Sequence, residues 1–181
     1  PNATLDVNGS FYASTADYLT LGETGRFDAA HPEQSVLTVD APSAFGFLTD
    51  TAAPITLEES YLRVPEGKTL SIVGGDVTVS NGNLYAPGGE IDLVSVASAG
   101  EVTLGASGPG VGSFERLGNI NIARTDLSYV EVNGTRIGDI DVSDEGGGAV
   151  YIRGGRFYLD GGKVYAHTMG EQTSKGGIDI R

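Results

Sequence analysis

Short apolar–polar–apolar triplets recur along the whole chain. In the most regular stretch, residues 64–93, four of them begin seven residues apart: Leu70-Ser71-Ile72, Val77-Thr78-Val79, Leu84-Tyr85-Ala86 and Ile91-Asp92-Leu93. A period of two residues is typical of a strand that buries one face. The glycines and the proline between the triplets argue against a helix, because each costs a helix interior roughly 1 to 3 kcal/mol. The pattern therefore predicts short strands joined by tight corners.

Three such triplets with their corners take up about 21 residues, a length that would place Ile91 beside Leu70 in the next turn of the chain. One turn cannot bury its own apolar residues, so successive turns must stack. The sequence thus predicts an all-β fold, a right-handed parallel β-helix (a solenoid) with about three short strands per coil and about seven to eight coils. Corners at every seventh residue are expected to need positive φ, which the 28 glycines supply.

The same plan is expected before and after the central stretch. Further triplets begin at Leu5, Phe11, Leu19, Phe27, Leu37, Phe45, Ile55, Val102, Ile120, Val130, Ile140 and Val150. The apolar block 42–48 (PSAFGFL) is expected to face inward. Segment 149–166 repeats the plan of 69–86, and 176–180 repeats that of 88–93, whereas 106–118 and 167–175 are expected to be long loops at corners.

Composition narrows the possible functions. The chain has 181 residues, a formal net charge of −13 and no cysteine. The charge argues against nucleic acid as a partner, since phosphate binding needs clustered Lys and Arg. The lack of cysteine excludes disulfides, a thiol nucleophile and a thiolate metal site. No stretch approaches the roughly 18 apolar residues that a membrane-spanning helix needs.

One acidic cluster is a candidate for chemistry, because many parallel β-helices act on polysaccharides. It consists of Asp139, Asp141, Asp144 and Glu145. Asp139 and Asp141 alternate on one strand face, so both are expected to point outward. A catalytic carboxylate pair would need close placement in a groove, and a calcium site lacks the GGxGxDxUx repeat. We favour a solvated strand and turn.

Other polar residues give no site from the sequence. His31 and His167 lie in predicted corners without ligand spacing, so we predict no catalytic, cofactor-binding or metal-binding residue. The glycine pairs at 74–75, 88–89 and 154–155 lack the phosphate-loop pattern and are interpreted as corners. The outward-facing tyrosines are interpreted as structural, and the last three lie on different sides of one coil: Tyr85, Tyr151, Tyr158 and Tyr165. The outward-facing threonines are interpreted as a structural ladder: Thr20, Thr38, Thr56, Thr78 and Thr103.

The chain resembles the filamentous haemagglutinin family, the large exoproteins of bacterial two-partner secretion with a haemagglutination activity domain. The resemblance rests on five motifs: STADYL (14–19), FGFL (45–48), VPEGKTLSIVGGDV (64–77), APGGEIDLVSVAS (86–98) and IRGGRFYL (152–159). The family's secretion domain carries two Asn-Pro-Asn motifs, and neither occurs here. Pro1-Asn2-Ala3 resembles the position just after the second of them, so transporter recognition is assigned to no residue of this chain.

The resemblance implies a structural and adhesive role. Residues 1–181 are expected to be a single β-helix domain, a fragment of a longer exoprotein, with 1–60 as the C-terminal part of the secretion-domain region and 61–181 as regular coils. The expected function is non-enzymatic adhesion by a secreted or surface-displayed protein of a Gram-negative-type bacterium. Expected partners are the outer-membrane two-partner secretion transporter, host or cell-surface glycans or proteins, and further copies that associate end to end. The alternatives are a polysaccharide-active β-helix enzyme and a carbohydrate-binding module that uses the loops 106–118 and 167–175.

Overall fold

The computed structural model describes residues 4–126 and 129–181 of the chain. Pro1–Ala3, on which the position relative to the Asn-Pro-Asn motifs depends, lie outside the described residues. Regular structure in the described residues is almost entirely strand, with one short 3-10 helix, η1 (Pro32–Gln34). No helix in this part of the chain is long and apolar enough to cross a membrane. The fold is therefore all-β, as the sequence predicts.

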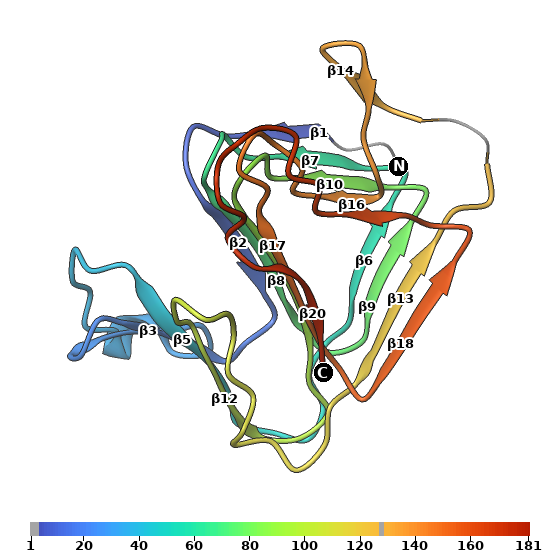
Figure 1. The fold of residues 1–181 in the computed structure, drawn as a ribbon. Coiled ribbons are helices and arrows are strands. Elements are labelled where there is room, and N and C mark those ends of the chain that lie inside the picture. The colour runs from blue at the N-terminus through green and yellow to red at the C-terminus, as the bar shows by residue number, and fades with distance from the viewer. Residues whose placement is uncertain (1–3, 127–128) are drawn as a thin grey trace.

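Most strands belong to three parallel sheets, which form the three sides of the triangle in Figure 1. The first sheet consists of β1 (Thr4–Asp6), β7 (Tyr61–Arg63), β10 (Asn83–Tyr85), β16 (Ile140–Asp141) and β19 (Val164–Tyr165). The second consists of β2 (Phe11–Ser14), β8 (Thr69–Gly74), β11 (Glu90–Ser95), β17 (Ala149–Arg153) and β20 (Gly177–Ile180). The third consists of β6 (Ile55–Glu58), β9 (Val77–Ser80), β13 (Asn119–Ala123) and β18 (Arg156–Asp160). We call these three sheets the parallel core.

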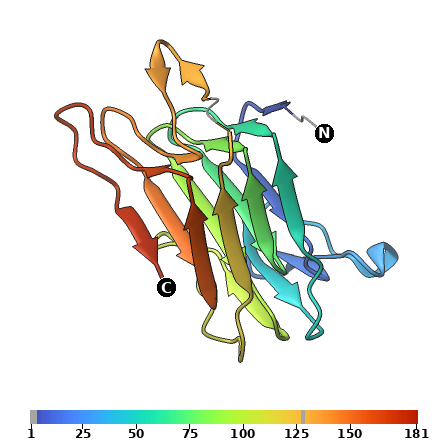
Figure 2. The same ribbon diagram turned by 90° about the vertical axis from the view of Figure 1, so that its right-hand side faces the viewer.

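The chain visits the three sheets in a repeating order. From β6 onward it passes from the third sheet to the first and then to the second, and it returns to the third with β9, β13 and β18. Figure 2 shows that strands of successive passes lie side by side, with β1 and β20 at opposite ends of the stack. The stacking of successive passes is thus visible both in the strand pairing and in the ribbon.

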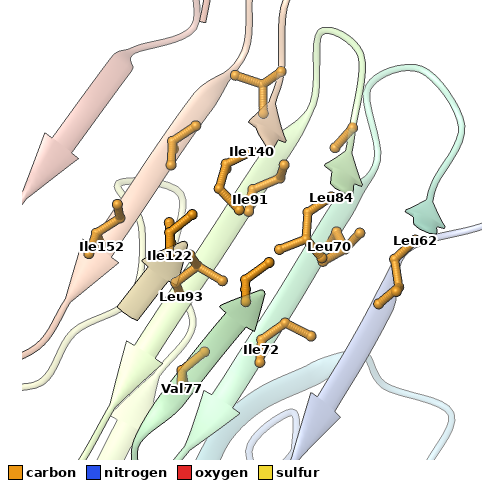
Figure 3. Close-up of a cluster of buried hydrophobic side chains, with 14 of the residues drawn as sticks. Leu62, Leu70, Ile72, Val77, Leu84, Ile91, Leu93, Ile122, Ile140 and Ile152 are labelled. Carbon is orange, nitrogen blue, oxygen red and sulfur yellow. The ribbon is translucent and has the colours of Figure 1, made fainter. Parts of the chain in front are cut away.

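Apolar side chains line up in register inside the parallel core. Ile91 pairs with Leu70, and Leu93 pairs with Ile72, so the predicted placement of Ile91 beside Leu70 is confirmed. The repeats of the sequence follow the same register, since Val150 pairs with Ile91 and Ile178 pairs with Val150. Figure 3 shows Leu70, Ile72, Ile91 and Leu93 in the cluster of aliphatic side chains between the sheets. Because one pass cannot bury its own apolar face, this shared interior holds the passes together.

A second sheet type departs from the expected plan. Strands β3 (Tyr18–Leu21), β4 (Gly25–Asp28), β5 (Pro42–Phe47) and β12 (Gly100–Thr103) form an antiparallel sheet in the order β12-β5-β3-β4. The triplets at 19, 27, 45 and 102 are therefore strands but do not belong to stacked coils, and that prediction is wrong. The described parallel sheets have five strands at most, so successive passes number fewer than the seven to eight coils predicted. We call these four strands the antiparallel extension.

The extension packs against the outer face of the second sheet. Phe45, Phe47 and Val102 form an apolar cluster with Val73 and Val94, which point away from the interior of the parallel core. The predicted inward-facing block 42–48 is thus buried from residue 44 to 47, although in this second cluster. The triplet predicted at Leu37 is not in a strand, and Leu37 is 69% exposed.

A hairpin, β14 (Glu131–Val132) and β15 (Thr135–Arg136), stands away from the parallel core (Figure 1). The triplet predicted at Val130 as part of a coil is therefore wrong. Asn133 and Gly134 form the turn with φ of 52° and 78°, which matches the two-residue type I′ turn that favours Asn-Gly. The predicted loops 106–118 and 167–175 are confirmed, because they connect β12 to β13 and β19 to β20.

Two further sequence-based expectations change. A positive φ is observed at Gly88 but not at Gly74, Gly75 or Gly89. At Gly75 and Gly89, close approach of backbone requires glycine instead. A Cβ on Gly75 would lie 2.3 Å from the carbonyl oxygen of Ala52, and one on Gly89 would lie 2.1 Å from that of Lys68. The predicted threonine ladder is limited to one pair, Thr56 with Thr78, after which Asn121 and Tyr158 continue the column.

Candidate functional site

The outer face of the first sheet carries a column of polar and aromatic side chains. Leu62, Leu84, Ile140 and Val164 point into the parallel core. The residues one position further on therefore point outward, because successive side chains of a strand alternate between faces. In register these are Arg63, Tyr85, Asp141 and Tyr165.

The hairpin lies beside this column and covers Tyr85, Asp141 and Tyr165. Its base is fixed by the buried Ile137, whose backbone N–H donates to the Val130 carbonyl oxygen at 3.0 Å. The Arg136 guanidinium lies 3.5 Å from the centroid of the Tyr129 ring, a cation–π contact. Arg136 also approaches Glu131 at 4.0 Å, but both side chains are exposed, so this ion pair adds little stability.

Two cavities result, of about 350 Å³ and about 320 Å³. Arg136, Ile137 and Tyr165 line both, so we describe them together as the hairpin groove. The first cavity extends over Asn83 and Asp139, and the second over Tyr85 and Asp141. A groove with aromatic walls and several polar groups is suited to a small polar ligand.

Asp139 lies under the groove and is 2% exposed, which contradicts the prediction of a solvated strand. One carboxylate oxygen accepts from Arg124 Nε, and the other accepts from the Lys163 backbone N–H at 2.7 Å. Arg124 also donates to the Gly82 carbonyl oxygen and to Asn83 Oδ1, at 3.1 and 3.2 Å. Asp139 is therefore buried because it satisfies backbone and guanidinium donors at a corner.

Asp141 is also 2% exposed, so its predicted solvent exposure is wrong as well. Its two oxygens accept from the backbone N–H groups of Gly138 and Ser143, each at 2.8 Å. Both carboxylates thus hold the corners on either side of β16. Their oxygens accept hydrogen bonds from Arg124 and from backbone N–H groups of the chain itself.

The other two acids of the cluster are more accessible. Asp144 is half-buried and lines the hairpin groove, whereas Glu145 is exposed and accepts from Gln172 Nε2 at 3.2 Å. In the described part of the chain, no group of three or more His, Cys, Asp or Glu residues is placed to hold a metal ion.

The sequence analysis did not predict that aromatic side chains of the hairpin groove form a candidate site. Tyr165 stacks on His167 with a centroid distance of 4.9 Å and an interplanar angle of 25°. Tyr85 lines the same cavity, and burial, followed by the Asp141 and Asp144 carboxylates, raises its pKa above the usual value. Its hydroxyl therefore remains a hydrogen-bond donor at neutral pH. The repeat that aligns 149–166 with 69–86 was the available signal, since it places Tyr165 where Tyr85 stands.

The remaining predicted residues lie elsewhere. Tyr151 and Tyr158 belong to the second and third sheets, which confirms that Tyr151, Tyr158 and Tyr165 occupy different sides. His31 is exposed beside η1, and its backbone N–H donates to Asp28 Oδ1 at 2.9 Å. His31 thus belongs to the loop after β4, whereas His167 belongs to the hairpin groove.

The structure is thus an all-β protein of stacked parallel strands around an apolar interior, with a hairpin and loops at the corners. The family model of the TPS secretion domain, the domain of two-partner secretion, matches residues 1–142, and the chain belongs to this family. The resemblance to the exoproteins of the filamentous haemagglutinin type is thereby confirmed. No curated protein and no solved structure matches the chain.

Family membership establishes several properties at a coarse level. The secretion domain identifies a secreted exoprotein, and two-partner secretion implies a transporter as its partner. The TPS secretion domain is a domain of secreted exoproteins and is not a known enzyme family.

Proposed function

We propose that the chain is a non-enzymatic, adhesive segment of its exoprotein and that it folds as a right-handed parallel β-helix. The observation that carries the fold is the repeating order of the three sheets, with Leu70, Ile91, Val150 and Ile178 in one column. Connections between parallel strands of one sheet are right-handed in nearly all proteins, which supports the proposed hand. A rod of this kind displays its corner segments at a distance from the secreting cell.

The domain organisation belongs to the same proposal. Residues 1–181 form a single domain within a longer exoprotein, with the regular coils in 61–181 apart from β12 and the hairpin. Residues 1–60 belong to the C-terminal part of the secretion-domain region, which the family match extends to residue 142. Pairing of β1 with β7 supports a continuous domain, because it joins the beginning of the described chain to the regular region.

The hairpin groove is the proposed adhesive surface, and a cell-surface glycan is its proposed ligand. The Tyr165 and His167 rings offer an aromatic face for the C–H side of a sugar ring. Tyr85, Asp144 and Arg136 line the same cavity and offer donors and acceptors for sugar hydroxyls. Ligand pockets are usually lined by aromatic and apolar side chains with a small number of polar groups.

The enzymatic alternative is less well supported by the same geometry. Hydrolysis of a polysaccharide needs an acid and a base within hydrogen-bond reach of the substrate. Asp139 and Asp141 are instead buried and accept from Arg124 and from backbone N–H groups.

The test is binding of the purified chain to a glycan array, with reducing-sugar release measured on acidic and neutral polysaccharides. We expect glycan binding without release, and at least a tenfold loss of affinity in Tyr165→Ala. Tyr158→Ala, an exposed tyrosine of the third sheet, is the matched control and should bind as the unmodified chain does. Sugar release, or equal binding by Tyr165→Ala, would contradict the proposal.

End-to-end association is a further part of the proposed role. Leu159, Ile178 and Ile180, on β18 and β20, are 45%, 45% and 50% exposed at one end of the stack. An unpaired strand edge with apolar side chains favours pairing with another copy. Light scattering should show the mean mass rising with protein concentration, and a constant monomeric mass would argue against this contact.

A further inference from the structure

Four oxygen-bearing side chains form a compact patch on the outer face of the second sheet. Glu90 and Asp92 lie two positions apart on β11, so they share one face of the sheet. Their partners on β8 are Thr69, opposite Glu90, and Ser71, opposite Asp92. The patch therefore brings two carboxyl groups and two hydroxyl groups together.

The loop that follows β12 covers this patch. Glu90, Asp92 and Thr69 line a cavity of about 330 Å³, together with Pro109 and residues 104–106. Arg153 holds the loop in place, because its Nε donates to the Pro109 carbonyl oxygen at 3.4 Å and its Nη2 to Asp179 Oδ2 at 3.0 Å. The patch is thus enclosed by a loop that is itself anchored to the sheet.

Two buried atoms of the patch are unsatisfied. Asp92 is 1% exposed and Ser71 is fully buried, and neither Asp92 Oδ1 nor Ser71 Oγ has a hydrogen-bond partner in the described structure. Buried polar atoms without partners are rare in folded proteins, because each loses its hydration without replacement. Asp139 and Asp141 show the contrast, since both of their oxygens accept hydrogen bonds.

The electrostatics of the patch favour a positive charge. Burial, followed by the neighbouring Glu90 carboxylate, raises the pKa of Asp92 to about 8, while the Ser71 hydroxyl and the Arg153 charge lower it in part. Burial also raises the pKa of Glu90, which Lys175 lowers in part. The titratable and charged side chains that face Asp92 from its own and the neighbouring elements are Glu90, Tyr12, Tyr151, Arg153, Lys175 and Asp179. Arg153 is engaged by Asp179 and by backbone carbonyls, and its charge lowers the pKa of Asp92 only in part.

We propose that Glu90, Asp92, Ser71 and Thr69 form a calcium site beneath the loop of residues 104–109. Calcium takes six to eight oxygen ligands in irregular geometry, and carboxylates, hydroxyls, backbone carbonyls and waters all serve. The cavity is large enough for the ion with bound water. With two carboxylates the affinity should be that of weak extracellular sites, with a Kd of about 10⁻⁴ to 10⁻³ M.

Binding would be coupled to the position of the covering loop. Since the ion would join strand β11 to the loop of residues 104–109, calcium should also stabilise the packing of this loop.

The experiment is a terbium titration of the full chain, with calcium as the competitor. Tyr12 and Tyr151 pair with Ser71 and Asp92 in register, so their rings should sensitise terbium luminescence at this site. Asp92→Asn retains the shape of the protonated carboxyl group and should fold, and we expect it to lower the affinity for both ions at least tenfold. Glu90→Gln should lower it similarly. Glu66→Gln is the control, because it removes the same charge from an exposed position.

A second measurement separates this site from general surface binding. Calcium at 5 mM should raise the Tm of the unmodified chain and of Glu66→Gln, but not that of Asp92→Asn. Lack of luminescence, or equal calcium binding by Asp92→Asn and the unmodified chain, would overturn the proposal.

Discussion

The parallel core and the antiparallel extension are built from the same kind of triplet, but they bury their apolar side chains in different ways. In the parallel core each strand pairs with a strand one pass away, and Leu62, Leu84 and Ile140 meet in one interior. In the extension, β3 pairs with β4, its neighbour in the chain, and the aromatic Phe45 and Phe47 pack on the outside of the second sheet. The difference teaches that alternation of apolar and polar residues identifies a strand but does not determine its partner.

The largest expected effect is the loss of stability when a buried side chain of either apolar cluster is replaced by alanine. Ile91→Ala removes a fully buried side chain from a central strand of the parallel core, and it should lower the free energy of unfolding by about 4 kcal/mol. Val102→Ala removes a smaller buried side chain from the extension and should cost about 2 kcal/mol. Urea denaturation measures both values.

Hydrogen exchange then sharpens the comparison. Ile91→Ala should reduce amide protection in all three parallel sheets, whereas Val102→Ala should reduce it mainly in β3, β4, β5 and β12. Uniform loss of protection in Val102→Ala would show that the core and the extension unfold as one cooperative unit.

The second effect concerns a corner of the parallel core. Gly89→Ala would bring a Cβ to 2.1 Å from the Lys68 carbonyl oxygen, which is backbone and cannot rotate away. We expect a loss of about 3 kcal/mol in the free energy of unfolding, from displacement of successive passes. Gly112→Ala is the matched control in the loop after β12, because its Cβ would meet no atom within 4 Å. Equal stability of the two variants would contradict the close packing at this corner.

The third effect is the pH dependence of the free energy of unfolding that Asp92, on the outer face of the second sheet, should cause. The pKa of Asp92 is raised to about 8 in the folded chain from 3.8, so the folded state holds its proton more tightly than the unfolded state. Its contribution to stability is therefore complete below about pH 4 and is lost as the pH rises towards 8, at up to about 1.4 kcal/mol per pH unit.

Asp92→Asn removes this titration. In the presence of EDTA, the free energy of unfolding of Asp92→Asn minus that of the unmodified chain should increase from pH 5 to pH 8. Urea denaturation at pH 5, 6.5 and 8 measures this difference. A difference that stays constant with pH would mean that Asp92 titrates normally in the folded chain.

The smallest effect concerns the hairpin, which belongs to neither apolar cluster. Gly134 has a φ of 78°, and a Cβ there would meet no atom within 4 Å, so Gly134→Ala introduces only backbone strain. We expect a cost of about 1 kcal/mol, confined to the hairpin. Exchange of the Ile137 amide should accelerate while amides of β8 and β11 keep their protection. Faster exchange in β8 would show that the hairpin stabilises the parallel core.

The sequence predicts the strands of the parallel core well because glycine-rich corners divide them at constant spacing. The pairing of Ile91 with Leu70 and the repeat at 149–166 both follow from that spacing. The antiparallel extension could not be predicted in the same way, since the triplets at 19, 45 and 102 have the same period as those of the core. Which strand pairs with which depends on contacts between residues far apart in the chain.

The candidate site was less predictable. Asp139 and Asp141 alternate with apolar residues and so suggest a solvated face, but Arg124 and the hairpin bury them. The Asn133-Gly134 dipeptide was a usable signal for the hairpin, as it is the preferred pair for a two-residue turn. Burial of Asp92 could not be read from its triplet, because the covering loop lies more than ten residues further along the chain.

The register of the second sheet has a consequence for how such a chain can evolve. Leu70 and Ile91 are 21 residues apart and Ile91 and Val150 are 59 apart, yet the two pairs occupy the same column. The additional residues between β11 and β17 form segments that begin and end at corners, so they do not change the register of the strands. Insertions and deletions at those corners should therefore be far better tolerated than a single-residue insertion within β11, so that relatives can exchange whole surface segments while retaining the same framework.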